Sequence, residues 1–377
     1  MDGRPRLATR LCEVLGTEYP IVQSGMGGVA GVDLAAEVCE AGGLGVLAGV
    51  LASPDTIRAA IRDLRSRTKR PFGVNLLLAT DLWPPAPAES VADETVEQVH
   101  TTLNRVRKAL ALPPAQGRPK PPPNLVSSAI EVILEERVPV FSIGLGDPGA
   151  DLVEDCHRRG IRVMAMVTTV ADAIAVEDSG VDVIVAQGGE AGGHRSHFTK
   201  PPSPQHGAVG AVALIPEVTA AVRVPVAAAG GIVDGRGLVA ALALGASGVL
   251  MGTRFVATQE STAPEVHKKA LLERTSDETT VTDAFSGRYA RAIRNDFTEQ
   301  YARSGAPVLP FFWQMFAAGD IFQAAARRED AEYLPLWAGQ SVGLVQSLPT
   351  AAEVVSDTIA QAHRLLSGGL AAMVTLD

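Results

Sequence analysis

The amino-acid sequence predicts a (β/α)8 barrel, or TIM barrel, with a small, mostly helical second domain toward the C-terminus. Over the first two-thirds of the 377-residue chain, eight short apolar runs rich in β-branched residues alternate with helical patterns. Glycine-rich segments follow six of these eight runs. The last third of the chain loses this alternation and contains most of the aromatic residues, which predicts the second domain.

The apolar runs are continuous instead of alternating with polar residues, which is typical of parallel strands covered on both faces. The predicted strands cover residues 20–24, 44–48, 71–76, 138–143, 161–167, 181–186, 224–228 and 247–251.

Helical patterns lie between the predicted strands, and several carry signals for helix ends. Ser53 and Pro54 suit the start of a helix over 54–67. Gly180 follows a predicted helix over 171–179, where glycine commonly ends a helix.

A doubly wound open sheet is the alternative to the barrel. Glycine-rich segments that follow so many different strands favour the barrel, because they would all lie on one rim. That rim is the C-terminal face, where the active sites of such barrels are found.

We expect the barrel over 1–274, a helical capping domain over 275–345, and a C-terminal segment over 346–377 whose helix packs back on the barrel. The eighth helix of the barrel is expected at 262–274. A proline-rich insertion at about 83–123, which flanks one helical stretch, is expected to be a surface excursion. The aromatic residues of the capping domain are expected to form its packed core.

Composition excludes several classes of protein. The formal net charge of −9 disfavours a nucleic-acid-binding protein, which usually presents a basic face. No apolar run is long enough to span a membrane, and the opening MDGRPRLATR lacks the apolar segment of a secretory signal. Three scattered cysteines exclude a disulfide framework and a cysteine-based zinc site. We therefore expect a cytoplasmic protein without nucleic-acid or membrane partners; a homo-oligomer is compatible with the sequence.

Two small-residue loops follow the last two predicted strands. The first contains Gly230 and Gly231, and the second contains the run VLMGTR around Gly252. Loops at these positions form the phosphate site of many barrels, because backbone N–H groups can approach the anion where no Cβ obstructs it. The alternative for each loop alone is that the glycines simply start a helix.

A third glycine-rich loop, QGGEAGGHR, follows the sixth predicted strand and begins at Gln187. Its small residues would let a planar ring lie on the backbone, and Gln187 could hydrogen-bond the edge of that ring. His194 can transfer protons near neutral pH, although a mobile loop with a solvated histidine is the alternative. His197 and His206 follow in the sequence and are expected as loop residues; no carboxylate lies at ligand spacing, so we expect no metal site. His100, His157, His267 and His363 lie in predicted helices and are expected at the surface.

Residues near the first and third strands complete the predicted rim. The loop QSGMGG follows the first strand, and Asn75 ends the third strand within PFGVNLL, where it would point to the rim. The glycine spacing in QSGMGG does not fit a dinucleotide-binding fingerprint.

The segments QSGMGG, AGGLGVLAG, PFGVNLL, VAQGGEAGGHR, AAAGGI, VLMGTRF, FSGRYARAIRN and LWAGQSVGL resemble those of the nitronate monooxygenases, formerly called 2-nitropropane dioxygenases. The resemblance covers most of the chain, except the proline-rich insertion and both termini. It implies an FMN-dependent TIM barrel with a small helical second domain. It also implies oxidation of an alkyl nitronate or nitroalkane by O2 to a carbonyl compound and nitrite.

The resemblance also implies roles for individual residues. His194 matches the active-site base of the family. The positions that match contacts to the flavin ring or ribityl chain are Met26, Asn75, Gln187 and Gly192, and those that match the phosphate site are Gly231, Leu250, Met251, Gly252 and Thr253.

The chain also departs from the family pattern, at Ser196, where glycine is common, and in the loop IGLGDP after the fourth strand. Three alternatives therefore stay open. The first is an NAD(P)H-dependent flavin reductase of quinones or of enoyl-acyl carrier protein on the same fold. The others are a non-catalytic flavin- or phosphate-binding protein and a sugar-phosphate barrel enzyme without flavin.

Overall fold

The computed structural model describes residues 7–78, 91–120 and 125–373. Eight parallel strands form one sheet in the order β1-β9-β8-β6-β5-β4-β3-β2. The backbone of β1 also pairs with the start of the β2 segment: Gln23 N–H donates to Leu44 O, and Leu44 N–H donates to Ile21 O, both at 2.9 Å. This pairing closes the sheet and confirms the predicted TIM barrel. The strands are β1 (Ile21–Gln23), β2 (Gly45–Ala48), β3 (Phe72–Leu77), β4 (Val140–Gly144), β5 (Arg162–Val167), β6 (Val183–Gln187), β8 (Val226–Ala229) and β9 (Gly248–Met251).

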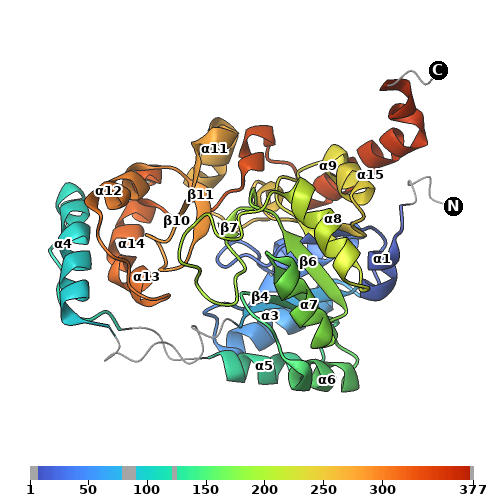
Figure 1. Ribbon diagram of the computed structural model, residues 1–377, viewed down its shortest axis with the longest axis horizontal. Coiled ribbons are helices and arrows are strands. Elements are labelled where there is room, and N and C mark those ends of the chain that lie inside the picture. The colour runs from blue at the N-terminus through green and yellow to red at the C-terminus, as the bar shows by residue number, and fades with distance from the viewer. Residues whose placement is uncertain (1–6, 79–90, 121–124, 374–377) are drawn as a thin grey trace.

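Helices surround the barrel (Figure 1) and bury the outward-facing strand residues in an apolar layer. Helix α3 begins with the expected cap, because Ser53 accepts from Thr56 N–H. Helix α9 is also capped, since Asp234 accepts from two amides at its start. Within the described ranges, no helix is long and apolar enough to cross a membrane. The outer helices include α2 (Val32–Glu40), α3 (Pro54–Arg67), α5 (Val126–Glu135), α6 (Ala150–Arg158), α7 (Val170–Asp178), α8 (Ala211–Ala221) and α9 (Gly235–Ala243), while α1 (Arg10–Leu15) packs on the interior core of the barrel.

The eighth outer helix differs from the prediction. α11 (Glu265–Glu273) lies within the predicted range 262–274, but it packs mainly on two short helical turns of the C-terminal region. α15 (Ala351–Arg364) instead packs between α9 and α2, where the eighth helix belongs. Helical periodicity marks an apolar face but does not identify the surface that the face covers. The predicted unit boundaries at 274 and 345 stay a prediction.

The polypeptide therefore leaves the barrel after β9 and returns to it at α15. We call the intervening residues 257–350, together with α4, the cap. Its helices are joined by a small antiparallel sheet in the order β10-β11-β7, which the sequence analysis did not predict. The cap elements are α4 (Asp93–Ala109), α11, β10 (Thr279–Thr282), β11 (Ala290–Ile293), α12 (Asp296–Ser304), α13 (Trp313–Ala317) and α14 (Gly319–Arg327), with short turns η2 (Ser276–Glu278), η3 (Ala331–Tyr333) and η4 (Gln340–Leu344). Short α10 (Thr253–Val256) precedes the cap, and turns η5 (Leu365–Gly369) and η6 (Ala371–Met373) follow α15.

Strand β7 (Gly193–His194) belongs to the loop after β6, yet it pairs with β11 of the cap. The glycine-rich loop of the barrel is therefore one edge of the sheet in the cap.

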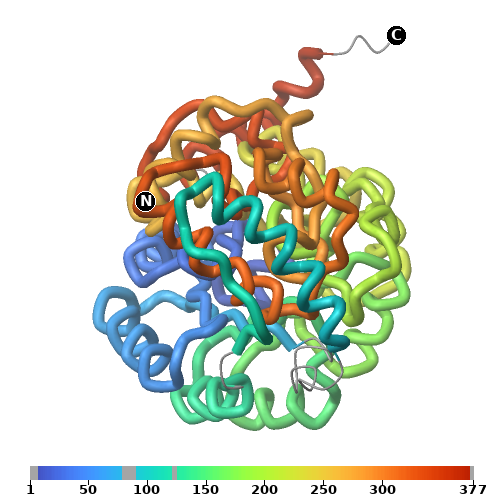
Figure 2. The backbone as a smooth tube through the Cα atoms, turned by 90° about the vertical axis from the view of Figure 1, so that its left-hand side faces the viewer, coloured from blue at the N-terminus to red at the C-terminus, as the bar shows by residue number. Residues whose placement is uncertain are grey.

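The helical stretch expected within the proline-rich insertion is α4, and it packs on the rest of the cap. The described proline-rich residues 113–120 that follow it lie at or near the surface, as expected. α4 buries Val99 and Leu103 in the same apolar cluster as Phe297 and Ile321. Figure 2 shows α4, in teal, lying across the orange and red chain of the cap. The segment WPPAPA at 83–88 lies outside the described residues.

An ion pair between a buried arginine and a half-exposed aspartate adds to this contact. The Arg107 side chain of α4 is only 2% exposed, and its Nε and Nη2 donate to the two Asp320 oxygens at 2.8 and 2.9 Å. Arg107 also donates to Asn104 Oδ1 and to the Ala317 carbonyl. The guanidinium lowers the pKa of Asp320 below its usual range, against the opposing effect of burial.

We expect Arg107→Ala to destabilise the protein by about 2 kcal/mol, because it leaves the buried Ala317 carbonyl without its donor and removes a buried side chain from the contact. Urea denaturation measures this change in the free energy of unfolding. Arg303→Ala is the matched control, since its ion pair with Glu299 lies on the surface of the same cap; it should cost about 0.5 kcal/mol or less. Equal effects of the two substitutions would contradict a structural role for the Arg107 pair.

Candidate active site

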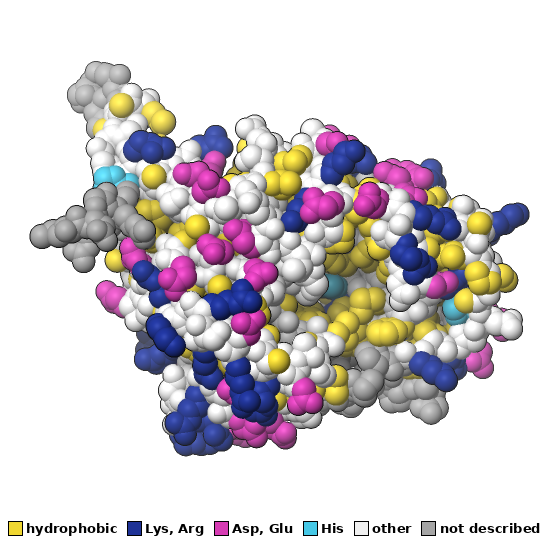
Figure 3. All heavy atoms as spheres, turned by 180° about the vertical axis from the view of Figure 1, so that it is seen from behind, with side chains coloured by type: hydrophobic (Ala, Val, Ile, Leu, Met, Phe, Trp, Pro, Cys, Tyr) yellow, Lys and Arg dark blue, Asp and Glu magenta, His cyan; other side chains and the backbone are white. Residues whose placement is uncertain are grey.

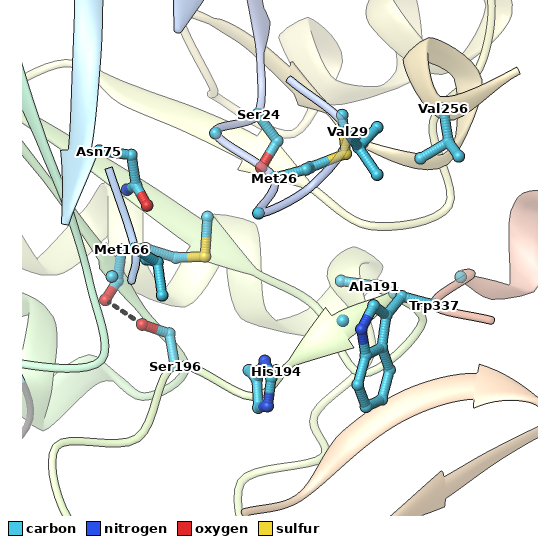
Figure 4. A pocket seen from close by; sticks show the side chains of 18 of the residues that line it. Ser24, Met26, Val29, Asn75, Met166, Ala191, His194, Ser196, Val256 and Trp337 are labelled. Atoms are coloured by element: carbon cyan, nitrogen blue, oxygen red, sulfur yellow. Dashed lines mark hydrogen bonds between the residues drawn. The ribbon is translucent and has the colours of Figure 1, made fainter. Parts of the chain in front are cut away.

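A cavity of about 490 Å3 lies between the C-terminal rim of the barrel and the cap. Its volume is in the usual range for small-molecule sites, roughly 300–1,000 Å3. Figure 3 shows a hollow with hydrophobic side chains over much of its wall, and Figure 4 shows rim residues pointing into the cavity. Nine of the ten predicted site residues line it: Met26, Asn75, Gln187, Gly192, His194, Gly231, Leu250, Gly252 and Thr253.

Met251 is the exception. It is 1% exposed and packs with Leu238 and Phe255 in the apolar cluster between the sheet and the outer helices. Successive residues of a strand face opposite sides, so Leu250 faces the barrel interior while Met251 faces outward. The Met251 side chain therefore points away from the cavity, and the role of this residue at the phosphate site stays a prediction.

The loops after β8 and β9 leave open space over their backbones. A Cβ placed on Gly231 would lie 3.8 Å from its nearest neighbour, and one placed on Gly252 would lie 3.7 Å from Met26 Sδ. Gly231 has a φ of +74°, which favours glycine. Among the described residues, no acceptor is bonded to the amides of Gly231 and Gly252. Because α9 begins only at Gly235, the glycine pair at 230–231 is not merely the start of that helix.

The loop after β6 is fastened at both ends by the Gln187 side chain. Gln187 Nε2 donates to His194 O at 2.9 Å, and Gln187 Oε1 accepts from Ser196 N–H at 2.9 Å. We expected this amide to bind the edge of a ligand ring, but both of its polar atoms hold the loop.

Buried arginines bind further carbonyl groups of the same loop. Arg195 donates to Gly188 O, Arg291 of β11 donates to Gly189 O, and Arg288 donates to His197 O. Burial, reinforced by the nearby Arg291 charge, lowers the pKa of Arg195 to about 10. A loop held by so many bonds is ordered, so the alternative of a mobile loop with a solvated histidine is wrong.

His194 lies within this loop beneath two aromatic rings. The centroids of Phe311 and Trp337 are 5.3 and 5.1 Å from the imidazole centroid. His194 Nε2 lies 2.9 Å from Ser286 Oγ. Burial, with a further contribution from the Arg288 charge, lowers the pKa of His194 to about 4. The imidazole is therefore neutral at pH 7 and able to accept a proton.

Asn75 is held at the opposite side of the rim. Its Nδ2 donates to the carbonyl and to the hydroxyl of Ser142, both at 3.1 Å. A Cβ on Gly25 would lie 2.4 Å from the Asn75 Cβ, so glycine is needed where the first rim loop crosses Asn75.

Sequence reasoning missed several lining residues. Ser142, Met166, Ser196, Phe311, Phe312 and Trp337 all border the cavity, as does Ser286, although FSGRYARAIRN had already drawn attention to its segment.

Other histidines also differ from expectation. We expected His100 and His267 on helix surfaces, but both are buried, and His267 lines the cavity with its Nε2 3.1 Å from Trp337 O. His197 and His206 lie in the loop after β7, as expected; His197 is buried against Thr168, while His206 is exposed. Across the described ranges, no group of three or more His, Cys, Asp or Glu side chains is arranged to hold a metal ion.

The barrel and its rim cavity define a TIM-barrel enzyme, and comparison with known proteins gives its family. A family model described as nitronate monooxygenase matches residues 8–361. The chain is 36% identical to a probable nitronate monooxygenase of Staphylococcus haemolyticus, over 90% of this chain and 92% of that protein. It is 34% identical to a protein of the same name from Staphylococcus saprophyticus, over 96% and 99% of the two chains.

Two solved structures are also similar. A nitroalkane oxidase from Streptomyces ansochromogenes has a TM-score of 0.85 and 34% identity, covering 96% of this chain and 99% of its own. FabK from Thermotoga maritima has a TM-score of 0.75 and 30% identity, covering 98% and 100%. The chain belongs to the nitronate monooxygenase family, a family of flavin-dependent oxidoreductases, as the sequence motifs predicted.

Three buried histidines should make stability depend on pH. Burial lowers the pKa values of His194, His197 and His267 from 6.5 to about 4. Above pH 6.5 these side chains are neutral in both the folded and the unfolded protein. Between pH 6.5 and 4 the unfolded chain binds protons that the folded protein does not. The free energy of unfolding therefore decreases as the pH is lowered through this range, by about 1.4 kcal/mol per pH unit for each histidine.

Denaturation at a series of pH values measures that slope. His267→Gln should reduce the slope by about 1.4 kcal/mol per pH unit, whereas His206→Gln, at an exposed position, should leave it unchanged. A slope that is the same in both variants would contradict the buried, neutral state of His267.

Proposed function

We propose that this protein oxidises alkyl nitronates, or the parent nitroalkanes, with O2 to a carbonyl compound and nitrite, and that its cofactor is FMN. The observation that carries the proposal is a neutral, half-buried His194 in the same cavity as two glycine loops, whose amides at Gly231 and Gly252 have no acceptor among the described residues. Family membership supports the reaction class, and the similarity to a nitroalkane oxidase agrees with it.

The cavity has groups suited to both the phosphate and the ring of a flavin mononucleotide. The open backbone at Gly231 and Gly252 would hold the terminal phosphate through N–H groups, since a Cβ there would occupy the space of the anion. Asn75 and the side chain of Met26 border the same cavity and would contact the flavin ring or ribityl chain. Bound FMN would supply the redox chemistry by accepting an electron from the nitronate, which the protein side chains cannot do.

His194 would act on the substrate carbon. When the Ser286 hydroxyl donates its one proton to the Arg288 carbonyl at 3.2 Å, His194 Nε2 would carry the ring proton in the contact with Ser286. Nδ1 then keeps its lone pair, with which it accepts a proton from the α-carbon of a neutral nitroalkane. Gln187 and the arginines hold the imidazole in place through the loop backbone.

An NAD(P)H-dependent flavin reductase is the second candidate, favoured by the structural similarity to FabK. The resemblance of the segment FSGRYARAIRN to the nitronate monooxygenases favours the nitronate reaction over the reductase.

The direct test follows nitrite release and O2 consumption when ethyl nitronate is added to the FMN-loaded protein. We expect both, without any added reductant. Rapid bleaching of the flavin by NADPH under anaerobic conditions, with no nitrite formed in air, would show the reductase instead. Bound FMN with neither activity would favour a non-catalytic flavin-binding protein.

The proposed phosphate site can be tested by a glycine-to-alanine substitution, which adds one methyl group to the loop backbone. Gly252→Ala should weaken FMN binding by about tenfold or more, because the new Cβ enters the proposed anion site, and should change riboflavin binding much less. Gly319→Ala, at an open position in α14 outside the cavity, is the control and should bind both flavins normally. Fluorescence titration measures both affinities; equal losses for FMN and riboflavin would contradict the phosphate assignment.

Substitution of His194 should affect the oxidation of neutral nitroalkanes and of nitronates to different extents. His194→Ala should lower kcat/KM for neutral nitroethane by about a hundredfold or more and affect ethyl nitronate much less, because the nitronate is already deprotonated. His206→Ala, at an exposed histidine of the downstream loop, should leave both values unchanged. An equal loss for the two substrate forms in His194→Ala would exclude the proton-transfer role.

A further inference from the structure

The cap side of the cavity is lined by aromatic and aliphatic side chains. We call this surface the apolar wall; it consists of Leu145, Phe311, Phe312, Met315, Phe322 and Trp337. None of the described residues that line the cavity is Asp, Glu, Lys or Arg. His194 and His267 also line it, and both are neutral at pH 7 because burial lowers their pKa values to about 4.

The apolar wall is adjacent to the proposed base. Phe311 and Trp337 both contact the His194 imidazole. A substrate whose reacting carbon lies at His194 therefore places the rest of its chain against this wall.

Backbone strain is concentrated around the same cavity. Six non-glycine residues in the described ranges have positive φ, and three of them, Leu51 (62°), Leu145 (57°) and Phe312 (65°), line the cavity. Such conformations cost about 1–3 kcal/mol each and are typical of binding sites. Here the strained backbone conformations place bulky apolar side chains on the wall of the cavity, where a ligand would contact them.

Ser196 helps to hold one of these strained residues. Its hydroxyl donates to Met166 O at 2.8 Å and accepts from Leu145 N–H at 2.9 Å. Leu145 in turn packs with Phe311 and Phe312. The serine that departs from the usual glycine therefore fixes one edge of the apolar wall.

We propose that the site selects nitronates with an apolar chain or ring and discriminates against nitronates whose chain ends in a carboxylate. This inference rests on the proposed function and names its substrate class. A carboxylate placed against the apolar wall would lose its water without gaining a cation. Each methylene group of an alkyl chain would instead leave water for an apolar surface. All these substrates carry the same negative charge on the nitronate group, so this charge contributes equally to their kcat/KM values and does not affect the ratios between them.

The test compares kcat/KM for the nitronates of nitroethane, 1-nitrobutane, 1-nitrohexane and 3-nitropropionate. We expect a rise of about fourfold per methylene group along the alkyl series, which is the fold-change for transfer of one methylene from water. The nitronate of 3-nitropropionate should be at least about tenfold poorer than that of 1-nitrobutane, which has a similar length.

A charged variant should reverse this preference. Met315→Lys, at a half-buried position of the apolar wall, should raise the ratio of 3-nitropropionate to 1-nitrobutane nitronate by about tenfold. Phe316→Lys is the matched control, because Phe316 is the next residue of α13, is 42% exposed and does not line the cavity. The control should leave the ratio unchanged.

Binding without turnover provides an independent measurement. Calorimetry of the flavin-free protein should detect binding of 1-nitrohexane and at least tenfold weaker binding of 3-nitropropionate. Equal binding, or a flat alkyl series together with normal turnover of ethyl nitronate, would overturn this inference and leave the proposed function standing. Absence of turnover with every nitronate, despite bound FMN, would instead overturn the proposed function.

Discussion

The site depends on the close approach of two backbones at Gly192 and Gly339. A Cβ on Gly192 would lie 2.4 Å from Gly339 N, so neither loop could keep its position if Gly192 had a side chain. Gly339 N–H donates to Thr253 Oγ1, and the next amide, Gln340 N–H, donates to Glu190 O. The loop after β6, the end of β9 and the cap therefore meet at one point, and the cavity lies beside that junction.

The chemistry of the cavity follows from this enclosure. The cap brings aromatic rings over His194, and the resulting loss of water keeps its imidazole neutral. The same enclosure favours apolar surface, and among the described lining residues none is charged, so the proposed anion site would rely on backbone amides. The proposed base, the apolar wall and the proposed anion site thus all lie beside one buried junction.

The barrel and most of the rim could be predicted because their signals are local. Each strand is a short apolar run, and each rim loop follows its strand directly, so strand order was not needed to bring Asn75, His194 and Gly252 to one face. The eighth helix, the pairing of β7 with β11 and the packing of α4 depend on contacts between distant segments, which a single sequence does not encode in its periodicity. The outward side chain of Met251 could have been foreseen from strand alternation, since Leu250 was assigned to the same site.

The most direct test of the account is a crystal structure of the protein with FMN bound. It should place the phosphate oxygens within hydrogen-bond distance of the Gly231 and Gly252 amides and the flavin ring in the cavity next to His194. An FMN bound elsewhere on the barrel, or one whose phosphate lies under the cap and whose ring lies at the glycine loops, would contradict it.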